Sequence, residues 1–133
     1  MKKWVLAIVV GFVVQLAGLF LIHSVLLRQD YVDTAGLWRP REAQIVRGWA
    51  MLLAVLIYVV GAVLVYVRGV EQKPWMGQGI RFGILLALVA VAYGSLSGWV
   101  ILPIPHMLVV KWILSESLLS VVFGLAVAGI CKP

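Results

Sequence analysis

Four long runs of apolar residues, separated by short stretches that contain most of the charges, form the pattern of this sequence. The runs comprise residues 4–27, 48–67, 82–102 and 107–131 and are 24, 20, 21 and 25 residues long. A helix needs about 20 apolar residues to cross the hydrocarbon core of a bilayer. The runs lack the period-two alternation of barrel strands, and a helix satisfies its own backbone hydrogen bonds in lipid. We therefore predict an all-α integral membrane protein with four transmembrane helices.

Small residues recur along each run at a spacing of three or four. Helices associate in lipid by close approach of their backbones, which small side chains permit. The predicted contact faces are Gly11, Gln15 and Gly18 in the first run, Ala50, Ala54, Gly61 and Ala62 in the second, Gly83, Ala87, Ala90, Gly94 and Gly98 in the third, and Ser117, Ser120, Gly124 and Ala128 in the fourth. We therefore expect residues 1–133 to form one membrane domain, a compact antiparallel bundle of the four helices.

The connection between the first two runs, residues 28–47, is the one segment long enough to have internal structure outside the bilayer. A short helix capped by Asp30 is predicted to place Tyr31 and Trp38 on one face, as expected for a segment in the headgroup layer. Pro40 suits the first turn of a helix, so the second transmembrane helix is predicted to begin there and to project above the lipid.

Composition and charge agree with a membrane protein and argue against a nucleic-acid-binding one. Hydrophobic residues make up 64% of the chain and charged residues 12%, and the mean hydropathy is +1.11, so a water-soluble fold is close to excluded. The net charge of +6 is scattered over the ends of the runs, where cations contact lipid headgroups. The side with the termini carries six cations and the opposite side four or five. This bias predicts cytoplasmic termini, and we expect a plasma (inner) membrane of the bacterial type.

Glu116 is the most informative single residue. It lies nine residues into the fourth run, which places it about 13 Å below the membrane surface by helical rise. A carboxylate at that depth needs a partner, and Gln15 of the first run has a comparable depth and a suitable face. Two interpretations stay open: Glu116 and Gln15 form a polar link between helices, or Glu116 relays protons or cations.

His23 and His106 form a second candidate pair, near the side of the membrane opposite the termini. Two histidines at similar depth on adjacent helices are able to ligate a haem or a transition metal. The sequence has no haem-attachment motif and no suitably spaced carboxylate, and Cys131 is the only cysteine. Hydrogen-bonding histidines at the interface are therefore the simpler interpretation, and no resident metal or cofactor is expected.

Three classes of function follow from these features. The least demanding is a binding or accessory bundle that contacts membrane lipid and assembles with itself or with a larger membrane complex. The second is a small transporter subunit that uses Glu116 as a relay. In size and layout the chain resembles the small multidrug-resistance transporters, although its intramembrane acid lies in the fourth helix instead of the first, so no site residue transfers. The third is a haem- or metal-binding membrane protein that uses His23 and His106.

No catalytic constellation accompanies the intramembrane serines. Ser95 and Ser120 have no histidine or lysine at their depth to act as a base. The chain also lacks a glycine-rich phosphate loop and a zinc-binding helix motif. We therefore expect that the protein is not an enzyme.

Overall fold

The computed structural model describes residues 2–133, and most of these residues are helical, with no β-strand among them. Four helices are long and apolar enough to cross a membrane. They are Lys3–Leu26 (α1, Lys3–Phe20, continued by the π-helix η1, Leu21–Leu26), α4 (Gly48–Gly69), Trp75–Ile101 (α5, Trp75–Leu86; the π-helix η3, Ala87–Ala92; α6, Tyr93–Ile101) and α7 (His106–Ile130). The all-helical prediction is thus confirmed.

The third long helix begins seven residues before the apolar run that predicted it. Its first turns contain Gln78, which is buried because its side chain bonds to the preceding loop. The Gln78 Oε1 accepts a hydrogen bond from the Glu71 N–H at 2.8 Å, and the Gln78 Nε2 donates to the carbonyl oxygens of Glu71 and Lys73, both at 2.9 Å. These bonds let a polar residue occupy a buried helical position.

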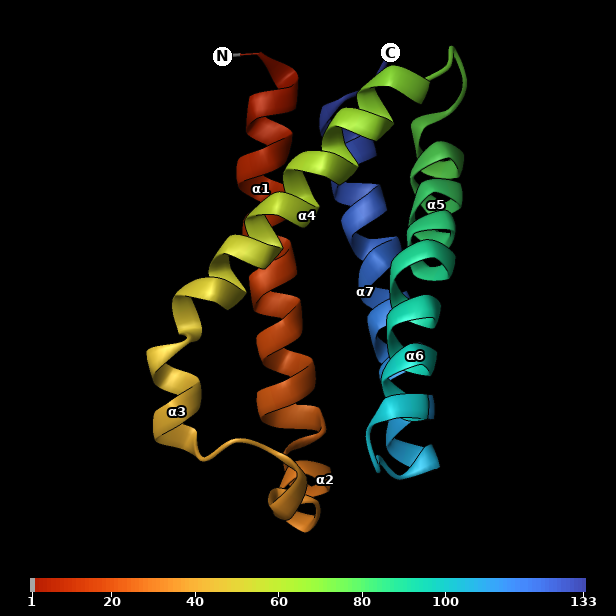
Figure 1. Ribbon diagram of the computed structural model, residues 1–133. Coiled ribbons are helices and arrows are strands. Elements are labelled where there is room, and N and C mark those ends of the chain that lie inside the picture. Colours follow the sequence, from red (N-terminus) through yellow and green to blue (C-terminus); the bar gives the residue numbers. More distant parts are fainter. Residues whose placement is uncertain (1) are drawn as a thin grey trace.

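Helix α7 lies between α1 and α5 and contacts both, while α4 crosses α1 diagonally (Figure 1). Both ends of the chain lie at the same end of the molecule, where the Lys3 Nζ donates to the Lys132 carbonyl oxygen at 3.2 Å. Helix α4 packs mainly on α1 and makes few contacts with α7. In the view of Figure 1, the lower half of α4 diverges from α6. The helices are therefore packed less closely in that part of the molecule.

Two groups of buried side chains form the core. The group nearer the termini includes Phe123 and Val127 of α7 with Val59 and Val63 of α4. The group nearer the opposite end includes Ile22, Leu27, Ile104, Leu108 and Leu119. Tyr31, Trp38 and Trp112 pack against this second group, and the site described below is built there.

The closest helix contact joins α5 to α7 through glycine. A Cβ atom added to Gly83 would lie 2.5 Å from the Val121 Cα and 2.6 Å from the Ser120 carbonyl oxygen. On the opposing helix, Gly124 lies against the backbone of Gly79 and Gly83. The predicted small-residue contact faces of the third and fourth runs are therefore correct at Gly83 and Gly124.

The predicted contact face is wrong further along the third helix. A Cβ atom added to Gly94 or Gly98 would meet nothing within 4 Å. The buried positions are instead Gly83, Ala87, Val91 and Ser95, a strict spacing of four. In a regular α-helix, with 3.6 residues per turn, positions spaced by four drift slowly around the helix axis. The wider turns of the π-helix η3 offset this drift, so the positions spaced by four stay against α7.

The first connection folds into three short helices: α2 (Arg28–Asp33), η2 (Ala35–Leu37) and α3 (Arg41–Val46). The predicted Asp30 cap is wrong, because α2 begins at Arg28 and Asp30 lies within its first turn. Helix α3 does begin directly after Pro40. A break at Arg47, with φ −97° and ψ 2°, separates α3 from α4, so the second long helix does not continue from Pro40 without interruption.

Candidate functional site

Glu116 pairs with His23 and not with Gln15. The His23 Nε2 lies 3.0 Å from the Glu116 Oε1, and the two side chains are 31% and 26% exposed. The expected hydrogen bond to Gln15 is absent: the Gln15 Oε1 is buried without a partner among residues 2–133. The π-helix η1 carries His23, so the pair links the end of the first long helix to the middle of α7.

The other ring nitrogen of His23 is hydrogen-bonded as well. The His23 Nδ1 lies 2.6 Å from the Tyr31 Oη, and the Trp112 Nε1 donates to that same oxygen at 2.7 Å. An indole N–H is a donor only, so the Tyr31 oxygen accepts from Trp112 and its hydroxyl proton is free to bond His23. The four side chains form one hydrogen-bonded chain from Trp112 through Tyr31 and His23 to Glu116.

This chain accommodates both charge states of His23. With neutral His23, the Tyr31 hydroxyl donates to Nδ1 and the Nε2–H donates to the Glu116 carboxylate. With protonated His23, both ring nitrogens donate, and the Tyr31 oxygen accepts twice. Transfer of the Nε2 proton from protonated His23 to the Glu116 carboxylate gives a neutral imidazole and a carboxylic acid. The Nδ1–H still donates to Tyr31, so this transfer breaks no contact with Tyr31, which is the geometry that a proton relay needs.

A second polar contact fastens the first connection to α7. The Lys111 Nζ lies 2.7 Å from the Asp30 Oδ1, and the Thr34 Oγ1 accepts from the Trp38 Nε1 at 2.9 Å. Trp38 also contacts Tyr31, with ring centroids 5.6 Å apart in an edge-to-face arrangement. Tyr31 and Trp38, which were predicted for the headgroup layer, thus pack against the ends of the long helices.

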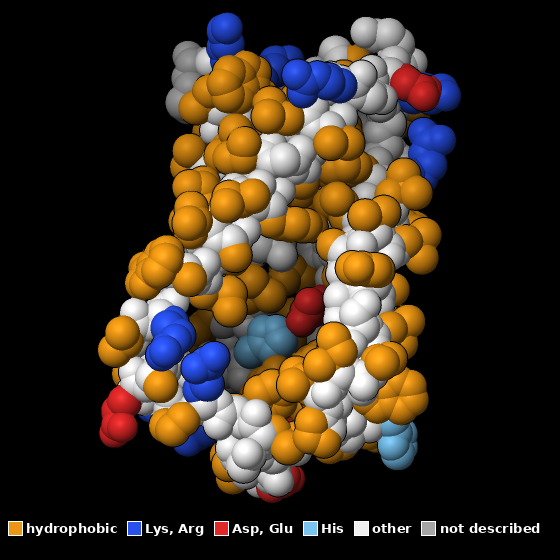
Figure 2. Space-filling view, viewed as in Figure 1, with side chains coloured by type: hydrophobic (Ala, Val, Ile, Leu, Met, Phe, Trp, Pro, Cys, Tyr) orange, Lys and Arg blue, Asp and Glu red, His pale blue; other side chains and the backbone are white. Residues whose placement is uncertain are grey.

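The His23–Glu116 pair stands between two hollows. One is a chamber of about 230 Å³ that is lined by residues of all four long helices, among them Gln15, Tyr58, Val91 and Glu116. The other is a cleft of about 950 Å³ between the first connection and the long helices, lined by His23, Tyr31 and Trp112 among others. Figure 2 shows this face hollowed, with a histidine and an acidic side chain visible inside.

Both π-helices contribute to these hollows. His23 and Ser24 of η1 line the cleft, and Ala90 and Val91 of η3 line the chamber. A π-turn inserts an extra residue and redirects the side chains that follow, and such turns are frequent at functional sites. The two irregular turns therefore coincide with the part of the molecule that contains the polar groups.

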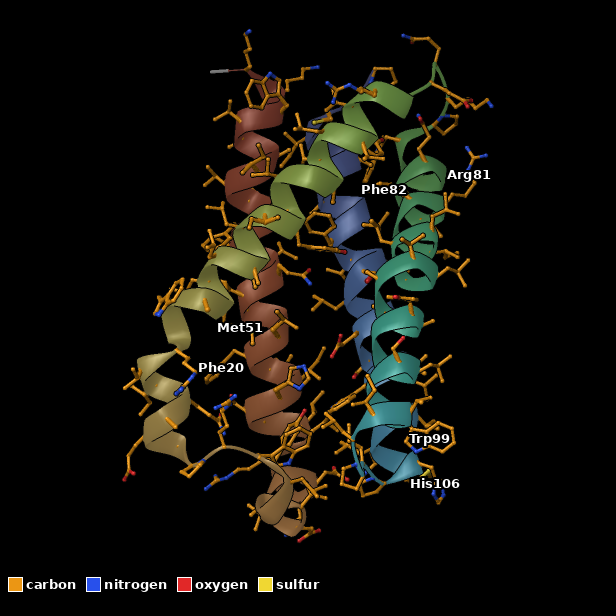
Figure 3. All side chains as sticks on the ribbon, viewed as in Figure 1. Phe20, Met51, Arg81, Phe82, Trp99 and His106 are labelled. Atoms are coloured by element: carbon orange, nitrogen blue, oxygen red, sulfur yellow. The ribbon has the colours of Figure 1, made fainter. Side chains whose placement is uncertain are left out.

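His23 and His106 occupy different surroundings. His106 is exposed at the start of α7 and projects from the edge of the molecule (Figure 3), whereas His23 is bonded to Glu116 and Tyr31 inside it. Within residues 2–133 no group of three or more histidine, cysteine, aspartate or glutamate side chains is arranged to hold a metal ion. The structure does not bring the two histidines together as a ligand pair.

The chain has no match among protein-family models, curated proteins or solved structures. Its function therefore has to be inferred from the groups that the fold brings together. Those groups are the His23–Glu116 pair, the two hollows beside it and the first connection.

Sequence reasoning found Glu116, Gln15, His23, Tyr31 and Trp38, and all five line the chamber or the cleft. It missed Trp112, which donates a hydrogen bond to Tyr31. It also missed Arg39 and Arg41, which line the cleft. The available signal was position alone, because Trp112 directly follows Lys111 near the start of the fourth apolar run.

Tyr31 supplies a prediction for alkaline pH. Its burial raises the pKa of Tyr31 to about 12, and the hydrogen bond from Trp112 opposes this rise in part. In the unfolded chain a tyrosine ionises near pH 10. The folded state therefore holds this proton more tightly, so its stabilising effect is complete below about pH 10 and is lost as the pH rises towards 12.

Chemical unfolding in detergent between these pH values tests the expectation. The free energy of unfolding of the wild-type protein should fall more steeply with pH than that of Tyr31→Phe, which has no phenol at this position. Identical slopes for the two proteins would mean that the Tyr31 hydroxyl is not buried as described.

Proposed function

We propose that this protein is a four-span membrane protein that binds an amphiphilic ligand in the chamber and cleft beside the His23–Glu116 pair. The observation that carries the proposal is the position of this pair between two hollows, one of which is lined by all four long helices. Ligand sites of this kind combine apolar walls with a few convergent polar groups.

Membrane insertion is supported by how little of each long helix is covered. No more than 33% of the most apolar part of any of the four helices is buried within the protein. Large apolar side chains such as Val89, Val100 and Leu114 are exposed on the outside. A surface of this kind is stable against acyl chains and not against water. We propose an antiparallel arrangement of the helices across the bilayer.

The distribution of charge supports an orientation with cytoplasmic termini. Lysine and arginine side chains lie at both ends of the molecule (Figure 2), and six of the eleven belong to the end that holds the two termini. Cytoplasmic segments of membrane proteins carry an excess of these residues. The chamber then lies within the membrane, and the cleft and the first connection lie towards the opposite surface.

Entry of the ligand from the lipid is supported by the course of α4. This helix packs on α1 and makes few contacts with α7, and the hollowed face in Figure 2 lies between α4 and the third long helix. An opening at that place faces acyl chains, so an amphiphile reaches the cleft without leaving the membrane.

A chamber-filling substitution tests the proposal. Ala54 lines the chamber, and Ala50, one turn away on α4, does not. Native mass spectrometry after reconstitution with a single-chain phospholipid and mild extraction is expected to show the lipid retained by the wild-type protein and by Ala50→Phe. Ala54→Phe should bind the lipid at least about tenfold more weakly, which corresponds to about 1.4 kcal/mol of binding free energy. Equal retention by all three proteins would contradict the proposal, as would no retention by the wild type.

A proton or cation relay through Glu116 is the second candidate, and the hydrogen-bonded chain from Tyr31 through His23 to Glu116 favours it. The chain connects the first connection to the chamber, so a proton is able to pass from one to the other by local transfers. In proteoliposomes, Glu116→Gln should abolish any uptake driven by a pH gradient while the protein stays folded. Uptake at the wild-type rate would reject the relay.

A further inference from the structure

The charged side chains that line the cleft are all potential cations. They are Arg39, Arg41 and His23, and no carboxylate belongs to the lining. Neither Arg39 nor Arg41 forms an ion pair with any carboxylate among residues 2–133. Of the acids near the cleft, Glu116 is paired with His23 and Asp30 with Lys111, and Glu42, next to Arg41 in the sequence, is not part of the lining. The cleft therefore offers two guanidinium groups that are free to bind an anion.

The remaining walls of the cleft are mostly apolar or aromatic. Leu37, Met51 and Leu102 supply aliphatic surface from three different segments, and Trp38 and Trp112 supply aromatic rings. A small inorganic anion would use only the arginines. The combination of two guanidinium groups with this apolar surface, in a volume of about 950 Å³, fits a molecule that has both an acidic head and an acyl chain.

The backbone that carries the two arginines is held in place. The Gln44 Nε2 donates to the Arg39 carbonyl oxygen at 2.6 Å, and Pro40 fixes the intervening φ angle at −51°. At its other end the connection is fastened by the contacts of Asp30 with Lys111 and of Tyr31 with Trp112. Groups that are positioned beforehand lose less entropy when a ligand binds.

We infer that the cleft binds the anionic phosphate headgroup of a lipid, with Arg39 and Arg41 as the headgroup ligands and the acyl chain lying along the apolar wall towards the chamber. This inference rests on the proposed function and adds the chemical class of the ligand. Guanidinium groups match the geometry of phosphate oxygens and bind them through paired N–H donors. A zwitterionic headgroup would instead bring its own cation next to the two arginines.

Tryptophan quenching in vesicles tests the inference, because Trp38 and Trp112 line the cleft. The protein is reconstituted in phosphatidylcholine that contains a small fraction of either brominated phosphatidic acid or brominated phosphatidylcholine. We expect brominated phosphatidic acid to bind at least about tenfold more tightly than the choline lipid. The variant Arg39→Gln/Arg41→Gln should lose this preference, whereas Arg28→Gln, which removes a cation of the same connection outside the cleft, should keep it.

The outcomes separate the inference from the proposed function. Equal quenching by the two brominated lipids above the level of random contact overturns the headgroup inference and leaves lipid binding intact. Quenching no stronger than random contact, together with no retained lipid in mass spectrometry, overturns both. Relief of quenching by soluble glycerol phosphate would show a site for free phosphate and overturn the lipid assignment. Persistence of the preference in Arg39→Gln/Arg41→Gln would overturn the role of the two arginines.

Discussion

Replacement of Gly83 by leucine is expected to separate α5 from α7 and to abolish the native bundle. The atoms nearest to an added Cβ belong to the backbone of α7 at Ser120 and Val121, so no side-chain rotation relieves the clash. Overpacking of a core typically costs about 1–3 kcal/mol, and a clash with a helix backbone should reach or exceed the upper end of this range. Unfolding by a titrated harsh detergent, followed by tryptophan fluorescence, measures the effect.

Gly98→Leu is the matched control for this substitution. Gly98 lies on the same long helix, but a Cβ atom there would meet nothing within 4 Å. The control should unfold at nearly the wild-type detergent concentration. If Gly83→Leu and Gly98→Leu behave alike, the glycine contact between α5 and α7 does not exist as described.

A double-mutant cycle on His23 and Glu116 is expected to show strong coupling. Either His23→Leu or Glu116→Leu leaves one polar partner without its bond in a largely apolar region, which should destabilise the protein by about 1–3 kcal/mol. The double variant removes both groups and should be less destabilised than the sum of the single variants. The coupling free energy should be about 1–3 kcal/mol.

His106 provides the control pair for the cycle. It is exposed at the start of α7 and has no contact with Glu116. His106→Leu combined with Glu116→Leu should therefore give additive effects on the free energy of unfolding. Additivity in the His23 cycle, or coupling of similar size in the His106 cycle, would count against a direct His23–Glu116 contact.

The four long helices were predictable from the sequence because length and continuous apolar character are local properties. The start of the third helix was not, because the turns before residue 82 include Gln78 and Arg81 and have lower hydropathy. Gln78 occupies a buried helical position only through its bonds to loop atoms. No local sequence pattern predicts such hydrogen bonds.

The contact faces were predictable only in part, because the expected contact at Gly61 also fails on the regular helix α4, where an added Cβ atom would meet nothing within 4 Å. Gly83 and Gly124 follow from small-residue spacing alone, whereas Gly94 and Gly98 were misplaced because the π-helix η3 alters the helical period. The apolar sequence of η3 gives no sign of a wider turn. The same holds for η1, which sets the direction of His23.

The polar groups of the candidate site were predictable individually, but their pairing was not. An acid deep in an apolar run needs a partner, and this reasoning singled out Glu116. The depth of Glu116 equals that of Gln15 only if the helices are straight and start level with the membrane surface, which the sequence analysis assumed. The structure sets the register of the first helix against α7 so that His23 reaches Glu116 and Gln15 lies beside the chamber.

Nitrogen NMR of isotopically labelled histidine in bilayers tests the His23–Glu116 contact most directly, and the chain contains only two histidines. The Glu116→Gln substitution should shift the ring nitrogen resonances of His23 and leave those of His106 unchanged, because only His23 is bonded to residue 116. Unchanged resonances of both histidines, or equal shifts of both, would contradict the account.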